Sequence, residues 1–191
     1  MKLIKIAFIG THGVGKTTLM YQLAGKLKMK GADSDALREI ARNCPFAVNK
    51  DTTKNGQRWI LFTQITKELD WLASKYNEKG RGLKTLICDR SVLDNYAYYV
   101  NAAGRDPVIE PLVREWVNSY DYLIYVPPQS NGKIEEDGFR DTTLAFQMKI
   151  DKLILKMCEE FGLKPLKLNP AKKDRWLPDL TRLCRKIVGA K

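Results

Sequence analysis

The 191-residue sequence is poor in the residues that build disulfide frameworks, metal centres and hydrolytic triads. Its four cysteines lie far apart and form no Cys-x-x-Cys pair, and His12 is its single histidine. These scarcities disfavour a zinc site, a disulfide framework and a Ser-His-Asp triad. No apolar run approaches the roughly 20 residues that a membrane span requires. The first apolar segment also leads into a glycine-rich motif instead of a signal cleavage site, so we expect a cytoplasmic protein with no membrane partner.

What the sequence has in excess is positive charge, with 33 Lys and Arg against 22 Asp and Glu and a net charge of +11. Residues 1–30 contain six lysines and no acidic residue, and residues 162–191 contain nine basic residues and two aspartates. Such an excess suits nucleic acid, because clustered cations bind phosphates with release of counterions. The remaining central residues carry eighteen basic and twenty acidic side chains. The charge therefore permits a nucleic-acid partner without requiring one.

Apolar runs and helical stripes alternate along the chain, and the 44% hydrophobic and 29% charged content is typical of a globular domain. We expect one domain over residues 1–191, with strands at 3–9, 85–88, 121–126 and 164–168. Residues 32–37 have an ambiguous pattern that could form a weak further strand. Helices are expected at 16–30, 57–76, after residue 91, at 107–119, at 146–161 and at 176–187. Strands alternating with helices predict parallel βαβ units and a three-layer α/β fold with a five-stranded, mostly parallel sheet. The polar stretch 129–141 is expected to be a loop.

The helix expected at 57–76 is marked by apolar residues at three- and four-residue spacing. These residues are Trp59, Phe62, Ile65, Leu69, Leu72 and Tyr76. Gln64 interrupts the pattern, and a single Gln on a striped helix is expected to be exposed.

The segment Gly10-Thr11-His12-Gly13-Val14-Gly15-Lys16-Thr17 fits the pattern G-x-x-x-x-G-K-[ST] between a predicted strand and a predicted helix. Such a loop turns its backbone N–H groups toward phosphates, and the helix dipole adds positive charge. Lys16 would reach the β- and γ-phosphates, and the Thr17 hydroxyl would ligate Mg²⁺. The expected ATP-binding residues are Gly10, His12, Gly13, Val14, Gly15, Lys16, Thr17 and Thr18. His12 fills a free position of the pattern, which assigns it no proton-transfer role.

The fate of the bound phosphate is suggested by the residues at the end of the strand at 85–88. GTPases usually carry an N/T-K-x-D guanine motif, and the sequence has none. Mechanical ATPases usually end this strand in Asp-Glu, whereas here it continues as Cys88-Asp89-Arg90-Ser91. With no second carboxylate poised to activate water, transfer of the phosphoryl group to an acceptor hydroxyl is favoured.

Four further segments carry a family resemblance: Arg38-Glu39-Ile40-Ala41-Arg42, Gln64, Cys88 to Tyr96, and Asp137-Gly138-Phe139-Arg140-Asp141. On these segments the chain resembles P-loop nucleoside and nucleotide kinases. It is most similar to ribosylnicotinamide-kinase-like domains and to AAA-type P-loop proteins of phages and prokaryotes, and its Asp-Arg-Ser segment is similar to that of deoxynucleoside kinases. The resemblance implies a P-loop kinase fold with a lid at about 129–141.

The resemblance also implies roles for individual residues. Glu39 would be the acceptor-side carboxylate, Arg42 a substrate-side cation, and Asp89 would hold Mg²⁺ through water. Arg90 would neutralise the transferring phosphoryl group, and Asp94 would contact the acceptor.

A lid arginine, Arg140, would close over the phosphates, although residues 129–141 offer only Arg140 and Lys133 where many nucleotide kinases have several arginines. Some of Tyr96, Tyr98 and Tyr99 could stack on a base, while others must belong to the core.

The sequence therefore predicts an ATP- and Mg²⁺-dependent kinase that acts on a hydroxyl of a nucleoside or nucleotide-like acceptor. One alternative is a kinase whose acceptor is a hydroxymethylated pyrimidine in DNA, such as 5-hydroxymethyluracil, which would need access to a flipped or single-stranded base. A second alternative is a regulatory P-loop ATPase that uses the nucleotide to control association with a partner.

Overall fold

The strands lie parallel in a five-stranded sheet in the order β2-β3-β1-β4-β5. The computed structural model describes residues 2–48, 52–77, 83–128 and 144–189. Its strands are β1 (Lys2–Ile9), β2 (Asp33–Leu37), β3 (Leu83–Asp89), β4 (Tyr122–Tyr125) and β5 (Leu166–Lys167). The three-layer α/β fold is thus confirmed, including the weakly marked strand at 32–37.

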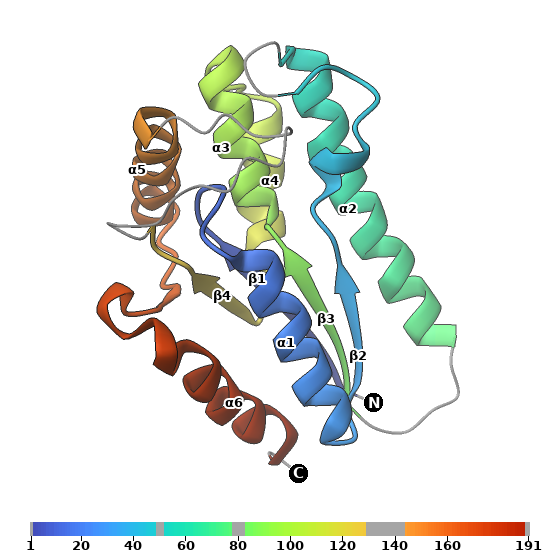
Figure 1. Ribbon diagram of the computed structural model, residues 1–191. Helices are drawn as coiled ribbons and strands as arrows, with labels where there is room; N and C mark the ends of the chain where they lie inside the picture. The colour runs from blue at the N-terminus through green and yellow to red at the C-terminus, as the bar shows by residue number, and fades with distance from the viewer. Residues whose placement is uncertain (1, 49–51, 78–82, 129–143, 190–191) are drawn as a thin grey trace.

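Helices cover both faces of this sheet (Figure 1). One face is covered by α1 (Lys16–Met29) and α6 (Lys173–Gly189), which lie side by side. The other face is covered by α2 (Lys54–Asn77), α3 (Val92–Ala103), α4 (Ile109–Val117) and α5 (Leu144–Glu160). Two short 3-10 turns, η1 (Ile40–Asn43) and η3 (Pro170–Lys172), follow β2 and β5.

The alternation of side chains along β1 divides the core in two. Ile4, Ile6 and Phe8 pack with the apolar residues of α1 and α6. Ala7 and Ile9 point to the opposite face and pack with residues of the other helices. Since successive strand residues face opposite sides of a sheet, a strand with few polar positions supplies both cores. β1 is therefore the buried centre from which the phosphate loop emerges.

The helix α2 forms where it is expected, but the predicted apolar face is only partly correct, because Ile65 and Leu72 pack in the core while other members do not. Phe62, Leu69 and Tyr76 are 42%, 49% and 71% exposed, whereas Gln64 and Glu68 are almost fully buried. Polar residues replace apolar ones on the inner face because Glu68 accepts hydrogen bonds from Lys5 and Tyr120 on other parts of the chain, and Gln64 donates to Glu68. The expectation that Gln64 is exposed is therefore wrong.

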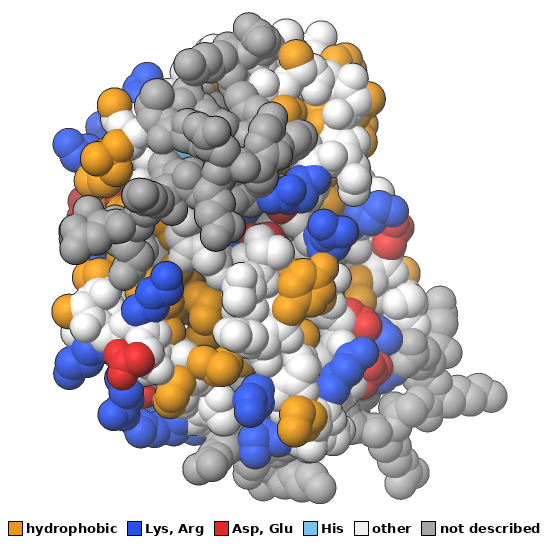
Figure 2. All heavy atoms as spheres, viewed as in Figure 1, with side chains coloured by type: hydrophobic (Ala, Val, Ile, Leu, Met, Phe, Trp, Pro, Cys, Tyr) orange, Lys and Arg blue, Asp and Glu red, His pale blue; other side chains and the backbone are white. Residues whose placement is uncertain are grey.

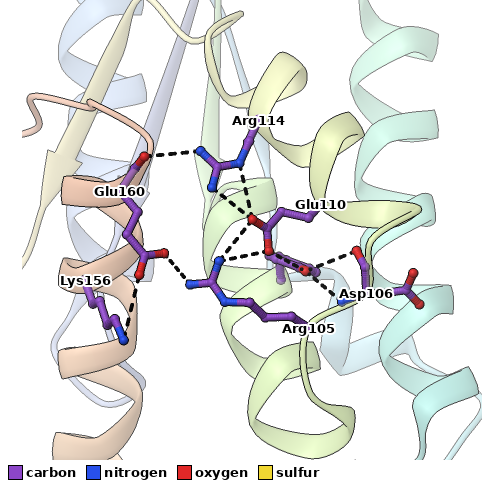
Figure 3. A network of polar contacts seen from close by, with 7 residues as sticks. Arg105, Asp106, Glu110, Arg114, Lys156 and Glu160 are labelled. Atoms are coloured by element: carbon purple, nitrogen blue, oxygen red, sulfur yellow. Dashed lines mark hydrogen bonds and ion pairs between the residues drawn. The ribbon is translucent and has the colours of Figure 1, made fainter.

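A network of ion pairs ties the segment around α4 to the end of α5 (Figure 3). Arg114 donates to a carboxylate oxygen of Glu110 and to the backbone carbonyl of Glu160. Arg105 bridges the carboxylates of Glu110 and Glu160, and Lys156 reaches Glu160 along α5. These partly exposed charges fasten the outer helices to one another.

Among the helices in the described part of the chain, none combines the length and the apolar character that a membrane crossing needs. The lid expected at 129–141, with Lys133 and Arg140, lies outside the described residues.

Candidate functional site

The phosphate loop joins β1 to α1, as its sequence pattern predicts. Gly15 precedes α1 with a φ of 91°, a left-handed conformation that glycine adopts without strain. Gly10 leaves β1 with a φ of 135°, and a Cβ there would lie 2.5 Å from the carbonyl oxygen of Val126. A side chain at this position would therefore collide with the backbone just after β4, which explains why the first residue of the motif is glycine. Gly13 and Thr18 are exposed, and Val14 is buried in the core beneath the loop.

Lys16 is a buried cation at the start of α1, only 5% exposed. Its ammonium donates to the carbonyl oxygen of Thr11 at 2.6 Å, within the same loop. Burial, reinforced by the positive charge of Arg90, lowers the pKa of Lys16 to about 8, although the carboxylates of Asp89, Asp94 and Glu39 act against this shift. These four charges therefore all act on the ammonium, which is the arrangement expected at a phosphate site built from residues distant in sequence.

The side chains predicted to serve magnesium meet at the end of β3. The Thr17 hydroxyl donates to a carboxylate oxygen of Asp89 at 2.5 Å, and Asp89 is 2% exposed. A hydroxyl and a carboxylate are oxygen ligands that Mg²⁺ accepts directly or through water. Within the described residues, no three His, Cys, Asp or Glu side chains gather into a metal site. The pair therefore fits a cation that takes most of its other ligands from phosphates and water.

Arg90 follows Asp89 in a conformation unusual for a residue with a side chain, with a φ of 88°. Its backbone N–H donates to the carbonyl of Phe8, so the β1–β3 pairing continues one residue past the strand. The guanidinium carbon lies 4.5 Å from the centre of the Tyr98 ring. Its Nη1 atom is buried and has no hydrogen-bond partner among the described residues. Strain and an unsatisfied donor are both typical of a group held ready for a ligand.

Glu39 lies just after β2 and is brought to Arg90 by the fold. Its carboxylate accepts from Arg90 Nε at 2.7 Å, and its second oxygen lies 3.3 Å from Arg42 Nε. Glu39 is 4% exposed, while Arg42 in η1 is partly exposed. The predicted acceptor-side carboxylate and its two arginines thus form one cluster.

Asp94 has a structural environment that its sequence position only partly predicts. One carboxylate oxygen accepts from the Gly10 backbone N–H at 2.8 Å, and the other accepts from the backbone and the hydroxyl of Ser91. With Ser91 it forms the capping box of α3. Burial raises the pKa of Asp94, while the charges of Lys16 and Arg90 oppose that rise. One oxygen thus holds the first residue of the phosphate loop and the other holds the start of α3, so these contacts give Asp94 a positioning role. The expected contact between Asp94 and the acceptor stays a prediction.

His12, an expected ATP-binding residue, packs beneath the loop and is 3% exposed. Its Nδ1 lies 2.9 Å from the hydroxyl of Tyr98, and its ring lies 5.6 Å from that of Phe146. Its backbone carbonyl accepts from the Gln147 amide of α5. Through Tyr98, the loop is linked to Arg90, a connection that the sequence did not predict.

Comparison with known proteins places this geometry in a family. The sequence model described as an AAA domain matches residues 5–175, which is most of the chain. The chain belongs to the AAA-domain family. A comparison with curated proteins found no match. Membership agrees with the loop geometry and makes the chain a nucleotide-binding P-loop protein of the ATPase and kinase class.

Gln64 of the AAA domain is a buried polar group at the site, although its sequence pattern predicts an exposed residue. Gln64 is 1% exposed and donates to a carboxylate oxygen of Glu68 and, at 3.5 Å, to the carbonyl of Arg90. The burial of Gln64 could have been predicted from its position on α2, one turn before Glu68, because this spacing puts both side chains on one helix face. Tyr98 gave a similar signal, because it lies one turn after Asp94 on α3.

Proposed function

We propose that this AAA domain is an ATP-dependent kinase that transfers the γ-phosphoryl group to a hydroxyl of a nucleoside or nucleotide-like acceptor. The observation that carries the proposal is the buried contact between Glu39 and Arg90, next to the Lys16 ammonium. A water-activating ATPase needs a carboxylate free to polarise water. Here the carboxylate is held by two arginines, an arrangement better suited to orient a hydroxyl than to act as a strong base.

Different residues of the site would bind ATP and orient the acceptor hydroxyl. Lys16 and the loop N–H groups would hold the phosphates of ATP, and Thr17 with Asp89 would hold Mg²⁺, which supplies charge neutralisation when bound. Glu39 would accept a hydrogen bond from the acceptor hydroxyl and so fix the direction of its attack. Because phosphoryl transfer needs little proton removal before the transition state, a carboxylate engaged by arginines suffices.

During transfer, the acceptor oxygen forms a bond to the γ-phosphorus while the bond from that phosphorus to the bridging oxygen breaks. ADP takes the electron pair of the broken bond, and the hydroxyl proton passes to Glu39 and then to water. Arg90 would contribute its unsatisfied Nη1 to the equatorial oxygens, where charge is concentrated. Arg140 remains the proposed lid cation.

Two buried polar atoms support a heteroaromatic, polar acceptor. Gln64 Oε1 and Asn95 Nδ2 have no hydrogen-bond partner among the described residues. Leaving such groups unpaired is costly, on the order of 1–3 kcal/mol each. A nucleobase offers both donors and acceptors on one rigid ring, so a single base could pair with both atoms.

The experiment is a transfer screen with γ-labelled ATP against nucleosides, nucleotides, and single- and double-stranded DNA with hydroxymethylated bases. Labelled nucleoside phosphate is the expected product. Lys16→Ala should abolish transfer, and Glu39→Gln should keep ATP binding while losing turnover. Label recovered in DNA alone would move the acceptor to a hydroxymethylated base.

Hydrolysis without transfer to any acceptor, unaffected by Glu39→Gln, would replace the proposal by a regulatory ATPase. Arg38→Gln provides a matched control, because Arg38 is an exposed neighbour of Glu39 that we give no role. Its activity should equal that of the unmodified protein.

A further inference from the structure

The two strongly basic ends of the sequence pack together in the fold. Residues 1–30 contribute α1, and residues 162–191 contribute α6, and these helices lie against each other on one face of the sheet (Figure 1). Their inner surfaces are apolar, with Leu23, Leu27, Trp176 and Leu180 buried. Apart from Lys16, which is buried at the phosphate loop, the described lysines and arginines of the two helices are exposed or partly exposed. Part of a charge excess that is split in the sequence is therefore brought together in space, although Lys5 and Lys16 are buried elsewhere.

This surface contains a groove between α1 and α6 of about 360 Å³. The groove is lined by Lys26 of α1 and by Leu177, Pro178, Thr181 and Arg182 of α6, none of them acidic. Figure 2 shows Lys and Arg side chains along α6 and around the end of α1 on this face. Lys26 of α1 and Arg182 of α6 thus lie at a groove that Leu177 and Pro178 line with apolar groups.

Acidic residues only partly offset this charge. The exposed Asp179 pairs with Arg175 at 4.0 Å. Asp179 lies about one helical turn before Arg182, and the only other acidic residue of α6, Asp174, is also exposed. The exposed Lys173 and Lys186 of α6 and the exposed Lys172 at the end of η3 add further cations. The net charge of the layer therefore remains strongly positive.

We infer that the α1–α6 groove binds the sugar–phosphate backbone of nucleic acid. Cations on two facing helices can contact phosphates on both sides of a strand, and the Arg182 guanidinium can contact a phosphate with two parallel N–H groups. A membrane surface is less suited to this face, because a helix that lies on lipid needs an exposed apolar face. On α6 that face, with Trp176 and Leu180, is buried against the sheet. The inference is independent of the proposed kinase activity.

The test measures binding of the full chain to short fluorescent DNA and RNA, single- and double-stranded, by anisotropy over a range of salt concentrations. The variant Lys26→Gln/Arg182→Gln/Lys186→Gln removes three cations of the groove and its continuation. If each contacts a phosphate, the slope of log K against log salt on duplex DNA should become shallower by about 2.7.

A matched control removes the same charge from the opposite layer, by Lys149→Gln/Lys152→Gln/Lys156→Gln on exposed positions of α5. Its salt slope should equal that of the unmodified protein. Equal loss in both variants would show that only net charge matters and would overturn the inference. Absence of nucleic-acid binding, or binding only to vesicles of acidic phospholipid, would overturn it as well.

Discussion

Two clusters of buried charge differ in how completely their charged groups are satisfied. In the first, which we call the Glu68 cluster, one carboxylate receives hydrogen bonds from Lys5, Gln64, Trp116 and Tyr120 at 2.5–2.9 Å. The Lys5 ammonium also donates to Ser119 and lies 4.9 and 4.6 Å from the centres of the Trp116 and Tyr120 rings. Each charge in this cluster has several partners.

The second cluster, of Lys16, Glu39, Asp89 and Arg90, is less complete. Arg90 retains an unsatisfied Nη1 and a left-handed backbone, and Lys16 has its pKa lowered by burial. Folding alone would select against such costs, each of order 1–3 kcal/mol. The difference is what we expect if the first cluster stabilises the fold and if, as proposed, a ligand completes the second.

The largest expected effect is on stability, from Glu68→Gln. This change leaves the Lys5 ammonium buried without its carboxylate, which should cost about 3–5 kcal/mol in free energy of unfolding. Urea unfolding measures this loss. Nucleotide affinity of the folded fraction should be unchanged, because Glu68 does not contact the loop.

The double variant Lys5→Met/Glu68→Gln tests the cause of that loss. With both charges removed, no buried charge remains uncompensated, and much of the lost stability should return. A double variant as unstable as Glu68→Gln alone would show that shape, not charge, is responsible. If Glu68→Gln lost phosphoryl transfer while its free energy of unfolding stayed unchanged, the Glu68 cluster would have a functional role and not the stabilising role that we assign to it.

The second prediction concerns Arg90→Lys, which keeps the charge but loses the planar fork that contacts Glu39 and stacks on Tyr98. If Arg90 stabilises charge in the transition state, turnover should fall by about 10²–10³. Unfolding measurements should show little change by comparison. Steady-state kinetics of phosphoryl transfer provide the check.

Arg114→Lys is the matched control, since Arg114 also pairs with a carboxylate and lies over an aromatic ring, that of Phe161. It belongs to the network of Figure 3, on the outer helices. Its replacement should leave turnover unchanged. Equal losses of turnover in Arg90→Lys and Arg114→Lys would show that Arg90 has no specific role in stabilising the transition state.

The strands and the phosphate loop could be predicted from the sequence because their signals are local. An apolar run from Leu3 to Ile9 followed by glycines at fixed spacing determines a strand, a tight loop and a helix start. The inner face of α2 could not be predicted in this way. Glu68 is buried because Lys5, 63 positions earlier, provides its charge partner. Periodicity within one helix contains no information about such a partner.

The candidate site also depends on contacts between residues distant in sequence, which local patterns cannot predict. The capping box of Ser91 and Asp94 has a local spacing, but the bond from Asp94 to Gly10 spans 84 positions. The contact of Asp94 with the acceptor therefore stays a prediction. The hydrogen bond by which its carboxylate holds the first residue of the loop is one that only the fold reveals.

The third prediction is a pH dependence of nucleotide binding. The proposed contact of ATP with Lys16 requires the charged ammonium, and in the free protein, where the pKa of Lys16 is lowered to about 8, that form is lost as pH rises through this value. Affinity should therefore be constant below this pH and fall above it, by up to about tenfold per pH unit. Calorimetric titration with MgATP measures the curve. Lys16→Arg, which stays charged, should bind with no such fall, and a fall of equal size would assign the titration to another group.

The smallest effect is expected from Tyr98→Phe, which removes the hydroxyl near His12 Nδ1 and keeps the ring over Arg90. One neutral hydrogen bond contributes about 0.5–1.5 kcal/mol, so turnover should fall by no more than about tenfold. Tyr98→Ala, which also removes the ring, should lose more. The double variant Tyr98→Phe/His12→Ala should be no worse than His12→Ala alone, because the two groups form one contact. Additive losses would mean that the phosphate loop and Arg90 act independently, and the second cluster would then be two sites instead of one.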